Sequence, residues 1–203
     1  AVIVGKFVGT RGLAAVGATG TITFLIIGFL MGVTTGVTVL TSQKFGAGRM
    51  DEMRKTVGNA AILSAVIAVV MTAVSMLGMH RLLVFMHTPE DIFDGAYGYI
   101  MIICAGIFTQ VLYNLVSSIL RALGNSKTPL YFLILAAGLN IVLDLVFIIF
   151  FHWGAPGAAW ATVISQGVSG VLCLIYMWKA VPELKMKKED WCFNRDIAVK
   201  QIS

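Results

Sequence analysis

The residue of this sequence with the clearest potential for chemistry is Asp144. It is the only Asp, Glu, Lys or Arg between Thr128 and Trp178, a stretch made almost wholly of apolar residues. A carboxylate inside a membrane-spanning helix costs about 2.5–3.5 kcal/mol on insertion, so it is by default a candidate ion ligand, proton carrier or counter-charge for a substrate. The alternative is a structural carboxyl that is protonated or paired with a neighbour.

Asn140 precedes Asp144 by one helical turn, so a helix would present the amide and the carboxylate about 40° apart on one side. The long apolar stretches contain no Lys or Arg, and they therefore offer Asp144 no ion-pair partner. Such a carboxyl is expected to be protonated or to hold a bound cation, and either state suits a carrier coupled to Na⁺ or H⁺.

A second group of polar side chains, Gln110, Asn114 and Ser117, shares one face of another apolar stretch. An amide in hydrocarbon is unfavourable unless it finds a partner. The pattern therefore predicts either hydrogen bonds to a neighbouring helix or the lining of a wet cavity, and the sequence leaves both open.

Glycines four residues apart, at Gly28, Gly32 and Gly36, form a further pattern. Small residues at this spacing line one helix face and allow a neighbouring backbone to approach closely. Close packing is the first interpretation, and glycines that let the helix bend during transport are the second.

The composition places these residues in a membrane. The 203 residues are 58% hydrophobic and only 12% charged, with a mean hydropathy of +0.89, whereas soluble chains carry roughly a quarter charged residues. This excludes a soluble enzyme, a disordered chain and a nucleic-acid-binding protein. The three cysteines are too few and too scattered for a disulfide framework, and no Cys or His spacing indicates a metal site.

The elements that must position Asp144 are membrane-spanning helices. A span needs about 20 mostly apolar residues, and the prolines stand at the borders of such stretches, where a helix tolerates them. Five spans are therefore predicted, near residues 13–41, 56–78, 94–120, 129–151 and 157–178.

The basic residues give the orientation. Lys and Arg are concentrated in the loops 44–55 and 121–127 and after residue 178, while 80–94 holds one Arg and 152–156 none. The basic side of a multi-pass membrane protein is cytoplasmic. The net charge of +5 is thus a topology signal of a protein of the cell membrane, and nucleic acid is not an expected partner.

Four segments resemble the multidrug and toxic compound extrusion (MATE) family, in order and with matching loop lengths. They are Phe45-Gly46-Ala47-Gly48, Leu120-Arg121-Ala122-Leu123-Gly124-Asn125, Leu139-Asn140-Ile141-Val142-Leu143-Asp144 and Gly157-Ala158-Ala159-Trp160-Ala161-Thr162. The Asn-x-x-x-Asp pair is the most specific of these elements, and the resemblance runs the whole length of the chain.

The resemblance implies an all-α, polytopic membrane helix bundle. Family members have twelve helices in two six-helix lobes, and residues 1–178 would supply helices two to six of the amino-terminal lobe. Residues 179–203 would form the cytoplasmic linker between the lobes and the start of the next helix. The expected partners are then the first helix, whose carboxylate would lie just before Ala1, and the carboxy-terminal lobe.

The resemblance also implies the site. Asn140 and Asp144 match the cation-binding pair of the family, Thr162 its hydroxyl ligand and Ala158 a carbonyl ligand one turn earlier. Tyr99 and Asn114 resemble polar positions around that site. Carboxylate, amide, hydroxyl and carbonyl oxygens are the ligands that hard cations such as Na⁺ prefer.

The expected function is the export of drugs or organic cations by alternating access, driven by inward Na⁺ or H⁺, with no cofactor besides the coupling ion. A flippase for lipid-linked oligosaccharides shares the fold, but it would line its cavity with basic residues, which these spans lack. An intramembrane enzyme would need two or more converging reactive groups. A membrane subunit without transport of its own is the third alternative.

Overall fold

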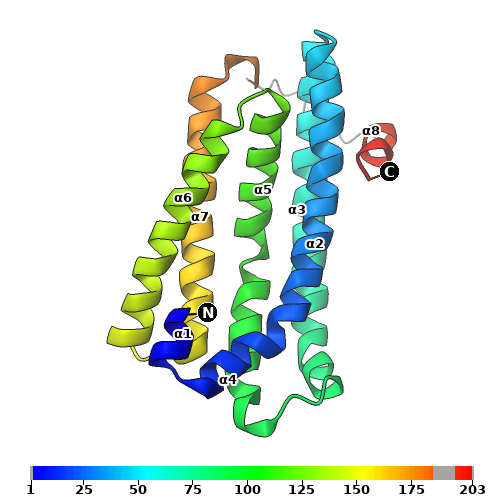
Figure 1. The fold of residues 1–203 in the computed structure, drawn as a ribbon. Helices are drawn as coiled ribbons and strands as arrows, with labels where there is room; N and C mark the ends of the chain where they lie inside the picture. The colour runs from blue at the N-terminus through cyan, green and yellow to red at the C-terminus, as the bar shows by residue number, and fades with distance from the viewer. Residues whose placement is uncertain (1, 185–194, 203) are drawn as a thin grey trace.

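The computed structural model describes residues 2–184 and 195–202, and every element in this part of the chain is helical (Figure 1). The α-helices are α1 (Val2–Phe7), α2 (Thr10–Gly46), α3 (Met50–Phe85), α4 (Glu90–Ala105), α5 (Ile107–Ala122), α6 (Lys127–Leu145), α7 (Gly154–Ala180) and α8 (Arg195–Ile202). A π-helix, η1 (Val146–Phe150), continues α6, and a 3₁₀ turn, η2 (Pro182–Leu184), follows α7.

Four of these units are long and apolar enough to cross a membrane: α2, α3, α7 and the joined α6 and η1. The pair α4 and α5, which is bent by 46°, makes a fifth when it is counted as one span. The predicted bundle of membrane-spanning helices is thereby confirmed. The helices α2 and α3 run well past the predicted limits, because a helix satisfies its own backbone hydrogen bonds and need not end where the apolar residues end.

α5 lies at the centre of the bundle, between α7, α2 and α3, and α7 also packs against α6 and α4. One buried cluster surrounds Ile100 and Ile107, and a second surrounds Val116 and Leu120. Large apolar side chains cover the outside as well, among them Phe24, Leu77 and Phe150. A bundle with an apolar exterior is suited to lipid rather than water.

The connections rich in basic residues lie at one end of the bundle. The α2–α3 turn, the α5–α6 turn and the end of α7 lie at the top of Figure 1. Gly48 and Gly124, with φ of 72° and 84°, close α2 and α5. The next amides donate back into the helix, that of Asn125 to the Leu120 carbonyl at 2.9 Å. Glycine is favoured at such left-handed helix ends. This explains why Gly48 and Gly124 stand at these positions of the segments that resemble the MATE family.

The bend between α4 and α5 is centred on Gly106, where α7 approaches closely. A Cβ on Gly106 would overlap the Val163 side chain of α7. Hydroxyl groups donate to carbonyls at the bend, that of Thr72 to Cys104 at 3.3 Å and that of Thr109 to Gly106 at 2.8 Å. The sequence predicted one span here without the bend.

The predicted division into a membrane lobe and a linker stays a prediction. Residues 185–194 of that linker lie outside the described residues.

Candidate cation site between α6 and α7

The short η1–α7 connection brings the predicted ligands of α6 and α7 together. The amide Nδ2 of Asn140 donates to the Thr162 hydroxyl oxygen at 3.3 Å, and that hydroxyl donates to the Ala158 carbonyl at 2.9 Å. The nitrogen of the Asn140 amide thus points toward α7, and its oxygen is available to accept a hydrogen bond or to bind a cation. Three of the four predicted groups form one hydrogen-bonded chain across the two helices.

Asp144 lies one turn further along α6 and is 7% exposed. Its Oδ1 atom is buried and has no hydrogen-bond partner among the described residues. Tyr99 of α4 lies close enough for its hydroxyl to interact electrostatically with the carboxylate. A buried carboxylate oxygen without a partner is costly, so this atom is a candidate position for a proton or a cation.

The apolar surroundings of the site strengthen this conclusion. Val4, Ile148 and Ala158 form a buried cluster, against which Tyr99 packs. In such surroundings charge interactions are stronger than in water, and an uncompensated charge is correspondingly unfavourable.

The π-helix directly after Asp144 was not predicted from the sequence. Its wider turn is closed by the Phe151 amide, which donates to the Val146 carbonyl at 3.2 Å. The rings of Phe147 and Trp153 stack with centroids 5.2 Å apart, and α7 begins so close by that a Cβ on Gly157 would lie 3.2 Å from the Phe147 Cβ. Such segments occur often at functional sites. Asp144 therefore lies in the second half of its span, two residues before this irregular backbone.

The other polar residues predicted for the site do not lie together in the structure. Asn114 donates to the Gln110 carbonyl of its own helix at 2.9 Å, and it lines a cavity of about 260 Å³ between α2 and α5. Ser117 is buried beside Cys173 of α7. The structure thus separates Ser117 from Asn114, and neither belongs to the group around Asp144.

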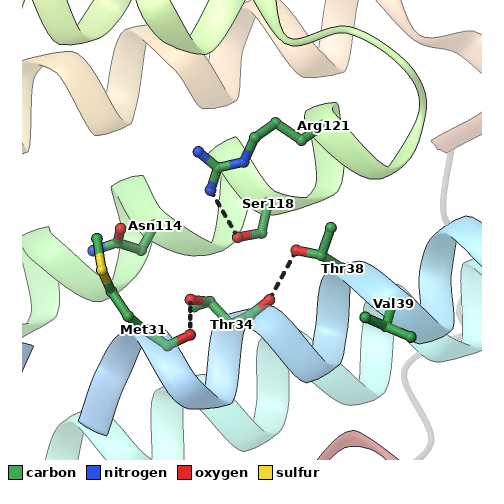
Figure 2. Close-up of a pocket in the computed structure, with 7 residues that line it drawn as sticks. All are labelled: Met31, Thr34, Thr38, Val39, Asn114, Ser118 and Arg121. Carbon is green, nitrogen blue, oxygen red and sulfur yellow. Dashed lines mark hydrogen bonds between the residues drawn. The ribbon is translucent and has the colours of Figure 1, made fainter. Parts of the chain in front are cut away.

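Figure 2 shows the cavity that contains Asn114. The hydroxyls of Thr34 and Thr38 donate to carbonyls of their own helix, at 3.0 Å to Met31 and 2.9 Å to Thr34. The Arg121 guanidinium donates to the Ser118 hydroxyl at 3.2 Å. Of the residues that line this polar pocket near the basic end of the bundle, the sequence predicted only Asn114 as a site residue.

Fold and site together define a multi-pass helical membrane protein with a buried carboxylate beside a polar contact between two helices. Comparison with known proteins gives the family. The family model MatE matches residues 1–146, and the chain belongs to this family of transporters. The resemblance predicted from the sequence is thereby confirmed.

Individual relatives agree with the family model. The chain is 32% identical over 176 residues to a Bacillus subtilis (strain 168) protein named "Probable multidrug resistance protein YpnP", which covers 87% of this chain and 40% of that protein. It is also similar to solved structures of a multidrug resistance MATE family transporter of the MOP superfamily. The inward-facing form matches with TM-score 0.90 and 28% identity over 98% of this chain and 46% of that one. The outward-facing form matches with TM-score 0.91 and 27% identity over 99% and 44%.

The comparisons also show how much of these proteins the chain represents. The chain spans less than half the length of the proteins that it matches. Its fold is similar to both the inward-facing and the outward-facing form, with TM-scores of 0.90 and 0.91.

Proposed function

We propose that the whole protein containing this chain is an antiporter that exports drugs or organic cations by alternating access, and that Na⁺ or H⁺ entering the cell drives the export. The observation that carries the proposal is the buried, unpartnered Oδ1 of Asp144 beside the Asn140–Thr162 contact. Membership of a family with multidrug resistance proteins supports the substrate class.

In this mechanism the coupling ion binds at Asp144. A proton would neutralise the carboxyl, whereas Na⁺ would use the oxygens of Asp144, Asn140 and Thr162 and the Ala158 carbonyl. Binding the ion removes an unfavourable charge from an apolar site, so the ion stabilises whichever state closes around it. Coupling then requires only that ion and drug differ in their affinity for the inward-facing and outward-facing states.

The experiment uses the full-length protein in proteoliposomes loaded with ethidium, a fluorescent organic cation. An imposed Na⁺ gradient and an imposed proton gradient are applied separately, and ethidium movement is recorded. Movement that needs one of the gradients supports antiport, and its ion dependence identifies the coupling ion. Equal movement without any gradient would contradict the proposal.

Arg121 favours one second candidate, an exporter of a substrate with an anionic group, such as the lipid-linked oligosaccharide of a flippase. Its guanidinium lines the cavity between α2 and α5 near the basic end of the bundle, and guanidinium groups bind phosphate well. The same proteoliposomes decide between the two by comparing ethidium with the anionic dye carboxyfluorescein.

The contact between Asn140 and Thr162 gives a further prediction. Thr162→Val keeps the shape of the side chain but removes the hydroxyl that holds the Asn140 amide. The ion concentration for half-maximal transport is expected to rise about tenfold or more, as when a group that completes an ion site is removed. Thr23→Val is the control, because the Thr23 hydroxyl bonds only within α2. An unchanged ion dependence in Thr162→Val would place the site elsewhere.

A further inference from the structure

The end of the chain makes a contact with the bundle that the transport mechanism above does not use. Gln201 of α8 is 1% exposed and lies against α3. Its amide nitrogen donates to the Thr56 carbonyl at 2.9 Å, and its amide oxygen accepts from Asn59 Nδ2 at 3.0 Å. Thr56 and Asn59 are themselves buried, so a pair of interlocked amides is shielded from solvent here.

α2 completes this contact through one glycine. A Cβ on Gly36 would overlap the carbonyl oxygen of Gln201, while Cβ atoms on Gly28 and Gly32 would have nothing within 4 Å. The close packing predicted for the three glycines is therefore present at Gly36 alone among the described contacts. α8 lies beside α2 and α3 (Figure 1).

Both ends of the Gln201 amide are bonded to α3, so this side chain fixes α8 against the bundle.

We propose that Gln201 and Gly36 form an anchor that fixes the segment after residue 194 to the basic ends of α2 and α3 throughout the transport cycle. α8 then moves with this helix bundle as one body, and the bending between the two halves of the carrier takes place outside it. The anchor itself is inferred from the contacts of α8. Its behaviour during the transport cycle rests on the proposed alternating-access function.

The test measures whether α8 separates from α2 and α3. In full-length protein with Cys192→Ser, a cysteine at the buried position Ala198 reports undocking through its reaction with a water-soluble maleimide, and one at the exposed Val199 gives the rate for a free position. In the otherwise unchanged protein, Ala198→Cys is expected to react slowly whether or not coupling ion and ethidium are present.

Two variants should release the anchor. Gln201→Leu is expected to raise the reaction rate at position 198 about tenfold, because it removes two interhelical hydrogen bonds. Gly36→Ala is expected to raise the same rate, because its methyl group would overlap the Gln201 carbonyl oxygen. Gly32→Ala is the matched control on the same helix and should leave the rate unchanged. Equal reaction rates in all three variants would contradict the anchor. It would also be contradicted if position 198 of the otherwise unchanged protein became reactive when coupling ion or ethidium is added.

Transport by the same preparations separates this proposal from the function on which it rests. If ethidium export is absent from the unchanged protein, the proposed function fails, while the reaction rates still decide whether α8 is anchored. If the unchanged protein exports ethidium normally and Gly36→Ala, with a freely reactive position 198, exports just as well, the anchor has no part in transport. In that case this inference is wrong while the proposed function stands.

Discussion

Cells that express the full-length protein with Asp144→Asn are expected to lose gradient-driven drug export, so that ethidium accumulates as in cells without the protein. Asparagine has nearly the shape of aspartate, so the packing around the buried position is retained. The amide can neither carry the exchanged proton nor supply a negative charge to a cation. The measurement is ethidium accumulation at matched amounts of protein in the membrane.

Asp94→Asn is the control for this variant. Asp94 is an exposed carboxylate in the first half of α4, so its replacement removes the same charge without touching the site. It is expected to export like the unchanged protein. Normal export by Asp144→Asn would show that the coupling ion does not bind at this carboxylate.

The second large effect is expected at the bend between α4 and α5. Gly106→Ala places a methyl group against the stiff, β-branched side chain of Val163, and overpacking of this kind costs about 1–3 kcal/mol. The midpoint of thermal unfolding of the purified protein is therefore expected to fall. Adding Val163→Ala removes the overlapping methyl groups and should restore most of the loss.

Gly138→Ala serves as the comparison for that variant. A Cβ on Gly138 of α6 has nothing within 4 Å, so alanine there should be neutral or slightly stabilising, because it favours the helix more than glycine. If Gly106→Ala were as stable as Gly138→Ala, the close contact between Gly106 and α7 would not exist in the protein.

Much of the fold follows from where the charges are absent. Stretches of 20 or more residues with at most one charge leave a chain few options besides membrane-spanning helices, and these stretches are helical here. The bend at Gly106 and the π-helix at Val146–Phe150 could not be predicted in this way. The bend depends on a contact with Val163 of α7, a residue far along the chain, and the π-helix depends on how α7 packs back against it. Neither contact can be read from the hydrophobic pattern.

Some of the polar site residues could be predicted from the sequence more securely than others. Asn140 and Asp144 stand out because their polarity conflicts with an apolar stretch, and one helical turn places them together. The grouping of Asn114 with Ser117 was less secure, since three residues along a helix leave two side chains about 60° apart. α5 is surrounded by helices, so that angle directs Asn114 toward α2 and Ser117 toward α7.

The central claim is that an ion bound at Asp144 is exchanged for the exported drug. The most direct test records ion entry and ethidium exit at the same time in proteoliposomes that contain the full-length protein. The account predicts a fixed ratio of ions to ethidium in the unchanged protein, and the loss of both fluxes in Asp144→Asn. Ethidium exit that proceeds without any ion entry, or ion entry that persists in Asp144→Asn at the same ratio, would contradict it.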